Sequence, residues 1–425
     1  MPPIRFIHAA DLHLDAAFSG LSRDIPADFA ERLRTATFTA FRRLLDLCER
    51  ESPDFLLLAG DVYNQEDASV SAQLALRDGF RRLESLSIPV FLVHGNHDPL
   101  ASRLRSVRWP GNVTVFGELP DAVPVFRKGE GTPLAIIHGA SHASGRETRN
   151  LAALFRRTEA CGLHVGLLHA TPGDADGVAR YAPFSQGDLK ASGMDYWALG
   201  HIHDRREVCR EPLAAYPGCT QGLHINEPGE KGCLLVTAEA RPDGGYAVRT
   251  SFRPLGPAVW KTLDMDLGGA ASLDELENRL RTGLDRAAAE VWSGCEMLLV
   301  RLRLPGRTEL DGLLRKGTTC AELADRLRED GSGVPRIWIK DIDVATRPCV
   351  ERGALLERED LLGEVFRLSE AARTASGLQA LREGPLAPLF AHARAGKALE
   401  PLTDEELARL LDDAESLCLD LLEND

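Results

Sequence analysis

The sequence lacks any apolar run of the roughly 18 residues that a membrane-spanning helix needs. It also lacks an N-terminal segment in which basic residues precede an apolar stretch, because residues 4–8 already have the pattern of a strand. Its nine cysteines are scattered, and none stands in a Cys-x-x-Cys pair. These absences argue against a membrane protein, a secretory signal, a disulfide framework and a zinc ribbon, and they predict reduced thiols in a cytoplasmic protein.

Positive charge is outnumbered, since 50 lysines and arginines face 64 aspartates and glutamates and the formal net charge is −14. Taken alone, this balance argues against nucleic acid as a partner, because phosphate binding usually rests on a basic surface. It does not exclude nucleic acid. Two bound divalent ions would add about four positive charges locally, and many of the acidic residues lie near the C-terminus.

The chain of 425 residues exceeds one ordinary domain, so we expect two or three, and its composition is that of a soluble globular protein. Up to about residue 255, short apolar runs alternate with amphipathic helical stretches, which predicts an α/β fold. The expected strands are residues 4–9, 55–59, 89–93, 135–138, 165–169, 196–199, 234–237 and 247–252. The expected helices are residues 29–49 and 69–86, and residues 241–245 have the composition of a hairpin turn.

Residues 254–257 predict a domain boundary, because they read Pro-Leu-Gly-Pro. After them we expect a small α+β module with strands at 260–267, 297–304 and 336–344 and helices at 272–291 and 310–329. We therefore predict domains at 1–255 and 256–347, followed by a charged, helical region at 348–425.

The last helix is expected to begin at a capping box formed by Thr403 and Glu406. Its expected apolar face carries Leu407, Leu410, Leu411, Ala414, Leu417 and Leu421. This face has two interpretations: it packs within its own domain, or it is a docking surface for a helix of a partner protein.

Five short motifs rich in histidine and aspartate occur in the first half of the chain. They contain Asp11 and His13; Gly60 and Asp61; Gly95, Asn96, His97 and Asp98; His169; and Gly200, His201 and His203. They follow the ends of expected strands, which is where open α/β sheets place ligand-binding loops. The ordered set predicts one shared site, although any single histidine among them is more often a structural residue than a ligand.

The residue types predict a centre for two divalent metal ions about 3.5–4 Å apart, able to hydrolyse a phosphate ester by in-line attack of a hydroxide that both ions share. Asp61 is the expected bridging ligand, because a carboxylate has two oxygens. Asp11, His13, Asn96, His169, His201 and His203 would complete the two sets of ligands. Oxygen and imidazole ligands without thiolates suit Mn²⁺, Fe or Zn²⁺ better than Ca²⁺.

His97 adjoins the ligand Asn96 and is left free for chemistry, so we predict that it protonates or stabilises the leaving oxygen. Asp98 either orients the His97 ring or forms a turn before Pro99. Arg103, Arg105 and Arg108, close to Trp109, either grip a nucleic-acid backbone or form a solvated helix face. His142 and His224 lie in expected loops and are weaker candidates for contact with substrate.

The segments DLHLD, GDVYN, GNHDPL, LLHA and GHIH resemble the calcineurin-like metallophosphoesterases. Together with YAPFSQGDL, YWALGHIH and YPGCTQGLHINEPGEKG, they resemble the DNA-repair exonuclease branch that holds the SbcD nuclease subunits and the YhaO proteins. The resemblance is strong over about residues 1–255 and weaker over the following module, which is similar to the capping domain of these nucleases. It implies a two-sheet β-sandwich core flanked by helices.

The resemblance also implies a division of the ligands. One metal would take Asp11, His13, Asp61 and His203, the other Asp61, Asn96, His169 and His201, and His97 would be the catalytic histidine. It further implies a Mn²⁺-dependent DNA exonuclease with 3′-to-5′ polarity and possible endonuclease action in DNA repair. The implied partners are DNA, a coiled-coil SbcC-like ATPase docked on the C-terminal helices and a second copy of the chain.

The sequence departs from some of these relatives, which carry a histidine three residues after the bridging aspartate, where this chain has Asn64. Metal binding does not depend on that position, but the polarity of the exonuclease does, so Asn64 is also a candidate DNA contact. Two alternatives stay open at this point. One is a phosphomonoesterase or cyclic-nucleotide phosphodiesterase, which the acidic charge favours, and the other is a non-catalytic scaffold subunit with a structural metal site.

Overall fold

The computed structural model describes residues 2–21, 25–64, 69–101, 107–174, 180–242, 244–329, 333–349, 352–392 and 402–422. The chain forms two compact units. The first comprises Met1–Leu263, Leu284–Arg301 and Arg328–Asp341, and the second comprises Asp264–Gly283, Leu302–Leu327 and Ile342–Asp425.

The first unit contains two six-stranded sheets, one with the order β12-β11-β1-β2-β3-β4 and the other with the order β5-β6-β7-β8-β10-β9. The strands of the first sheet are β1 (Ile4–Ala9), β2 (Phe55–Ala59), β3 (Val90–Val93), β4 (Val113–Val115), β11 (Gly232–Ala240) and β12 (Tyr246–Pro254). Those of the second are β5 (Asp121–Val125), β6 (Ala135–Ala140), β7 (Leu163–His169), β8 (Tyr196–Gly200), β9 (Arg206–Arg210) and β10 (Leu213–Tyr216).

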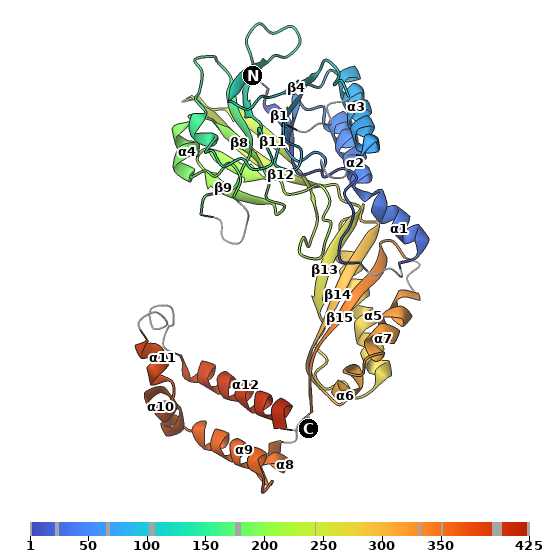
Figure 1. The fold of residues 1–425 in the computed structure, drawn as a ribbon, viewed down its shortest axis with the longest axis vertical. Coiled ribbons are helices and arrows are strands. Elements are labelled where there is room, and N and C mark those ends of the chain that lie inside the picture. The colour runs from blue at the N-terminus through green and yellow to red at the C-terminus, as the bar shows by residue number, and fades with distance from the viewer. Residues whose placement is uncertain are drawn as a thin grey trace. The chain divides into compact units, whose positions relative to one another are not determined.

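Buried side chains hold four layers together in the order helices, sheet, sheet, helices. Alternate residues of a strand point to opposite faces, so Leu57 faces the second sheet and packs with Val165, whereas Leu58 faces the helices. The outer face of the first sheet is covered by α2 (Ala36–Glu51) and α3 (Val70–Ser85), and α4 (Gln186–Ala191) lies against the second sheet (Figure 1). The predicted α/β fold with two sheets flanked by helices is confirmed.

Two expected helices are each broken in the structure. Residues 29–49 divide into α1 (Ala27–Arg34) and α2, because the Thr35 hydroxyl donates to the carbonyls of Glu31 and Arg32 and the chain changes direction there. The two helices then pack on different cores, since Phe29 of α1 joins Trp260 and Trp338, and α2 joins the helix side of the first sheet. Residues 310–329 divide into α6 (Asp311–Leu314) and α7 (Thr319–Glu329) near Gly317, a residue type that disfavours helix.

The elements expected after residue 255 occur in the expected order. β13 (Ala258–Asp264), β14 (Met297–Thr308) and β15 (Arg336–Pro348) form a three-stranded sheet, and α5 (Leu273–Glu290) follows β13 along the chain. The C-terminal region contains α8 (Arg352–Leu356), α9 (Leu361–Ala372), α10 (Ala375–Glu383), α11 (Ala387–Ala391) and α12 (Asp404–Leu422). None of the helices in the described ranges is long and apolar enough to cross a membrane.

The capping box of α12 is present, because the Thr403 amide donates to the Glu406 carboxylate and the Glu406 amide donates to the Thr403 hydroxyl. Of the two interpretations of the apolar face, packing within its own domain is wrong in part. Leu407 and Leu419 are buried, and Leu419 packs with Phe366, whereas Leu410, Leu417, Leu421 and Ala414 are exposed. Glu415 is buried on the inner face of α12, because Arg352 pairs with its carboxylate. The face of α12 that packs therefore includes Glu415, and the leucines at 410, 417 and 421 lie on another face.

Candidate metal centre

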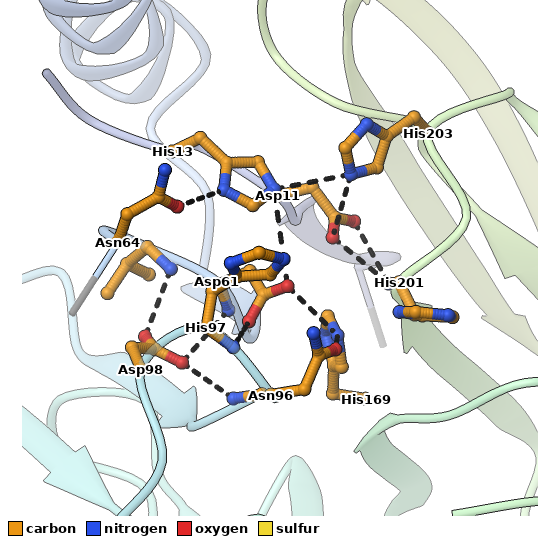
Figure 2. Close-up of polar contacts among 12 residues, drawn as sticks. Asp11, His13, Asp61, Asn64, Asn96, His97, Asp98, His169, His201 and His203 are labelled. Atoms are coloured by element: carbon orange, nitrogen blue, oxygen red, sulfur yellow. Dashed lines mark hydrogen bonds and ion pairs between the residues drawn. The ribbon is translucent and has the colours of Figure 1, made fainter. Parts of the chain in front are cut away.

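The ligand candidates come from the carboxyl ends of central strands in both sheets. The strands β1, β2 and β3 run parallel side by side, as do β7 and β8, so the loops that follow them emerge at one edge of each sheet. Because the two sheets pack face to face, these edges bring residues from all five motifs together. Figure 2 shows the side chains of Asp11, His13, Asp61, Asn96, His97, His169, His201 and His203 around one space.

Backbone hydrogen bonds join the first two ligand loops. The amides of Asp11, His13 and Leu14 donate to the carbonyls of Gly60, Asp61 and Val62, each at 3.1 Å. Four ligand candidates have positive φ, namely Asp11 at 51°, His13 at 40°, Asp61 at 50° and His201 at 104°. Non-glycine residues adopt this region at an energetic cost, and such residues cluster at active sites. The fold therefore holds the backbone of these four residues in a strained conformation.

The glycines that precede three of the ligands leave room for the ring of His169. A Cβ at Gly60 would lie 2.6 Å from His169 Nδ1, and one at Gly200 would lie 2.9 Å from the same atom and 1.8 Å from the Ala59 carbonyl oxygen. A Cβ at Gly95 would lie 2.3 Å from Asp61 Oδ1. The lone histidine of the sequence is thus enclosed by the glycines of the other motifs, which explains the Gly-Asp, Gly-Asn and Gly-His pairs.

Replacing Gly95 with alanine is expected to weaken metal binding by at least about tenfold, because Asp61 and His169 must move and such sites tolerate shifts of only about 0.5 Å. Titration of the metal-free protein with Mn²⁺ measures the change. Gly117→Ala is the control, since a Cβ at Gly117 meets nothing within 4 Å. Unchanged affinity in Gly95→Ala would contradict this account of the glycine.

The ligand atoms gather in two groups. Those of Asp11, His13 and His203 lie within 4.8 Å of one another, as do those of Asp61, His169 and His201. Asp61 Oδ2 lies 3.2 Å from His169 Nε2 and 4.0 Å from His13 Nε2, so its carboxylate stands between the groups. Asn96 Oδ1 lies 3.0 Å from His169 Nε2. This arrangement brings together all seven predicted ligands and gives Asp61 the place expected of a bridge.

Burial and charge at the site favour bound cations. Burial raises the pKa of the Asp11 carboxyl above its usual range, with His169 the main opposing influence. Burial also acts against ionisation of Asp61, but the surrounding histidines, His169 first, bring its pKa well below the usual range. Burial lowers the pKa of His169, and the Asp61 charge outweighs it and raises that pKa to about 9. Two buried carboxylates that need positive charge nearby, with imidazole nitrogens converging on them, fit a pair of divalent ions.

His97 is the exposed member of the constellation. Its ring centroid lies 5.1 Å from that of His13, and its backbone amide donates to Asp61 Oδ1 at 2.9 Å. The side chain therefore stands at the open side of the site, and the main chain is what connects this residue to the ligand Asp61.

Two roles are predicted for Asp98, orienting the His97 ring or forming a turn before Pro99, and its contacts in the structure are with the backbone of the loops. Its carboxylate is fully buried and accepts from the amides of Gly95 at 2.7 Å, Val62 at 3.0 Å and Asp61 at 3.2 Å. The side chain thus ties the loop after β3 to the loop after β2. Because these bonds satisfy backbone donors in the interior, Asp98 acts on the position of Asp61.

The residues predicted to contact DNA or substrate differ in their exposure and in their contacts. Asn64 Oδ1 lies 2.7 Å from His13 Nδ1, so its side chain supports a ligand. His224 Nε2 lies 3.2 Å from Glu227 Oε1, and Arg108 is exposed. Arg103 and Arg105 lie outside the described residues. His142 is buried, and its Nε2 lies 2.6 Å from the His169 carbonyl oxygen, so it supports the His169 backbone and is closed to substrate.

Sequence reasoning missed two residues beside His203. The Glu227 carboxylate pairs with His203 Nδ1, and Lys231 Nζ donates to the His203 carbonyl at 3.0 Å. Both residues lie in the segment YPGCTQGLHINEPGEKG. The sequence shows only an acidic residue in a loop at position 227, and its burial beside His203 depends on the folded chain.

Comparison with known proteins finds relatives over most of the chain. Residues 4–205 match the family described as calcineurin-like phosphoesterase, and residues 260–347 match the family described as metallophosphoesterase YhaO, middle domain. The chain is 34% identical over 388 residues to the metallophosphoesterase YhaO of Bacillus subtilis, covering 90% of this chain and 91% of that protein. It is 28% identical over 320 residues to the DNA double-strand break repair protein Mre11 of Aeropyrum pernix, covering 68% and 69%. It is 24% identical over 390 residues to the Mre11 protein of Haloferax volcanii, covering 87% and 78%.

Proposed function

This chain belongs to the calcineurin-like metallophosphoesterases, hydrolases of phosphoester bonds, and we propose that its substrate is the phosphodiester backbone of DNA. The observation that supports phosphoester hydrolysis is the convergence of seven ligand candidates with Asp61 between the two groups. We propose a Mn²⁺-dependent exonuclease, with endonuclease action as a further activity, that works in DNA repair.

The ligands would divide between two metal ions as the resemblance implies. Asp11, His13 and His203 would hold one ion, Asn96, His169 and His201 would hold the other, and Asp61 would contact both. Two divalent ions bound there supply charge neutralisation for the phosphate and activate a water molecule for attack. Asp11 and Asp61 are buried and held in place. Their carboxylates therefore keep the same positions while a substrate binds and reacts, which preserves the arrangement of the ligands.

His97 would handle the proton on the leaving side. The ring is exposed and lies against the ring of His13, so a ring nitrogen can donate a proton to the departing deoxyribose oxygen. Because its amide is bound to Asp61, the position of this histidine is set by the same loop that sets the bridging ligand.

The choice of DNA rests on the relatives and on the segment after residue 255. The Mre11 proteins are named for the repair of DNA double-strand breaks. We propose a nuclease domain at 1–255, a domain at 256–347 that contacts DNA, and a helical region at 348–425. A small phosphate ester would need no separate contact domain, whereas a polymer substrate gains affinity from each additional phosphate contact.

For partners, we propose a coiled-coil ATPase that docks on the C-terminal helices, and pairing with a second copy of the chain. The exposed leucines of α12, Leu410, Leu417 and Leu421, are suited to contact with a partner helix. The cytoplasmic location stays a prediction, and all nine cysteines are free thiols in the structure.

The experiment that tests the proposed function compares bis(p-nitrophenyl) phosphate, a phosphodiester, with p-nitrophenyl phosphate, a phosphomonoester, in the presence of Mn²⁺. We expect the diester to be hydrolysed faster and a chelator to stop the reaction until Mn²⁺ is restored. Preference for the monoester would favour a phosphomonoesterase. Absence of hydrolysis of both substrates by the metal-loaded protein would favour the scaffold alternative.

A further inference from the structure

The segment between β10 and β11 surrounds His203 on the side away from the other ligands. The Glu227 carboxylate pairs with His203 Nδ1. The opposite ring nitrogen, His203 Nε2, lies 3.8 Å from Asp11 Oδ1 and 3.2 Å from His13 Nε2. The two nitrogens of this ring therefore have separate roles, one toward Glu227 and the other toward the proposed metal ligands.

Glu227 is itself fixed by its neighbours. Its side chain is only 8% exposed. Oε2 accepts from the Leu223 amide at 2.6 Å, and the Glu227 amide donates to the His224 carbonyl at 2.9 Å. A buried carboxylate held at both oxygens keeps a defined direction, so the contact with His203 Nδ1 is built into the loop and is independent of surface mobility.

The partner of His203 differs in charge from the partners of two other ligand histidines. His13 Nδ1 lies 2.7 Å from the amide oxygen of Asn64, and His169 Nδ1 lies 2.9 Å from the backbone carbonyl of Ala59. Both of those acceptors are neutral. Glu227 carries a charge. A carboxylate that accepts a hydrogen bond from Nδ1–H fixes the ring tautomer and makes the opposite nitrogen a stronger metal ligand.

We propose that Glu227 is a positioning residue that sets the affinity of one metal site, the one formed by Asp11, His13 and His203 with Asp61, without binding the metal itself. The inference rests on the proposed two-metal function and deepens it, because it makes the two metal sites unequal. The site that includes His203 would bind Mn²⁺ more tightly than it would with a neutral partner at Nδ1, and the site of Asn96, His169 and His201 would be independent of Glu227.

A separate metal site on this side of His203 is a different interpretation, because the ligand atoms of His203, Cys219 and Glu227 also lie within 4.8 Å of one another. The hydrogen bonds favour the positioning role. The Nδ1 atom already has the Glu227 carboxylate as its acceptor, and the other oxygen of that carboxylate accepts from the Leu223 amide.

The backbone of His203 is held without Glu227. Lys231 Nζ and the Cys219 amide both donate to the His203 carbonyl, at 3.0 Å and 3.2 Å. A substitution at Glu227 should therefore alter the orientation of the His203 ring and leave the backbone of His203 in place. Its effect on metal binding can then be separated from a loss of structure.

The test is a titration of the metal-free full chain with Mn²⁺. Calorimetry measures the heat of binding, and electron paramagnetic resonance distinguishes free from bound Mn²⁺. Glu227→Gln keeps an acceptor oxygen and removes the charge, and Glu227→Ala removes both. We expect one of two sites to weaken, by about 10-fold in Glu227→Gln and about 100-fold in Glu227→Ala, while the other site stays within about twofold of wild type. Glu230→Gln, which removes the same charge from an exposed neighbour, is the matched control and should bind as wild type does.

Equal weakening of both sites, accompanied by a lower unfolding temperature of the metal-free protein, would overturn the proposal in favour of a general structural role. Unchanged affinity of both sites would overturn it as well, and loss of a third, separate Mn²⁺ would favour the alternative metal site. These readouts need no DNA. A protein that shows the expected split in affinity but cleaves no phosphodiester would contradict the proposed function and leave the role of Glu227 standing.

Discussion

Asp61→Asn is expected to abolish phosphodiester hydrolysis, with a loss of at least about 10³-fold. The Asp61 carboxylate is the group that stands between the two sets of ligands, 3.2 Å from His169 Nε2 and 4.0 Å from His13 Nε2. An amide of the same shape has one oxygen to offer and no negative charge, so it cannot hold two cations at once. Both metal sites should weaken together, which distinguishes this variant from one at Glu227.

Metal content after dialysis and the rate of cleavage of bis(p-nitrophenyl) phosphate measure the two consequences separately. Asp78→Asn removes an equal charge from an exposed position on α3, where the carboxylate pairs with Arg77, and serves as the control. Retention of two bound Mn²⁺ ions by Asp61→Asn at wild-type affinity would contradict the bridging role.

His97→Ala is expected to lower the rate of DNA cleavage by about 10²- to 10⁴-fold, the range typical of a general acid, while both metal ions stay bound. The reason for retention lies in the backbone. The contact of His97 with Asp61 runs through its main-chain amide at 2.9 Å, and alanine keeps that amide. Activity and metal binding should therefore separate in this variant, unlike in Asp61→Asn.

The leaving group offers a second measurement for the same variant. A deoxyribose oxygen needs a proton as it departs, whereas p-nitrophenolate is stable without one. The loss caused by His97→Ala should therefore be large on DNA and much smaller on bis(p-nitrophenyl) phosphate. An equal loss on both substrates would place His97 outside the protonation of the leaving group, and an unchanged rate on DNA would contradict any catalytic role for it.

The ligands could be found from the sequence because each one sits directly at or after a strand. The strand at residues 55–59 was predicted with the bounds of β2, and Asp61 follows it after one glycine. Parallel neighbouring strands end at the same edge, so position after a strand is a good predictor of position in space. His169, the least specific motif, was placed by the order of the set, and the structure encloses it between Gly60, Gly95 and Gly200.

The roles of Asp98 and Glu227 could not be read from the sequence, because they depend on what the folded chain brings near them. Asp98 adjoins His97 in the chain, yet its carboxylate turns to the amides of Gly95, Val62 and Asp61. Glu227 is 24 residues from His203 and reaches it only through the folded loop. Asp98 is next to His97 in the sequence but contacts the backbone of the loops, whereas Glu227 is far from His203 in the sequence and contacts it in the folded chain.

The ends of the helices and the faces that they bury also depend on contacts that the sequence does not show. Residues 29–49 carry one uninterrupted helical pattern, but Thr35 ends α1 so that the two halves reach different cores. In α12, the apolar period predicted one face, whereas the ion pair of Arg352 with Glu415 selects another stripe for packing. Periodicity identifies the element, and the neighbours it meets decide where it bends and which face it buries.

The measurement that tests the central claim most directly is a time course on end-labelled single- and double-stranded DNA with Mn²⁺, comparing wild type with metal-loaded His97→Ala. The account predicts that wild type shortens the labelled strand, that chelation stops it, and that His97→Ala with both metals bound cleaves at least about 10²-fold more slowly. Intact DNA after prolonged incubation with metal-loaded wild type, or equal cleavage by wild type and His97→Ala, would contradict it.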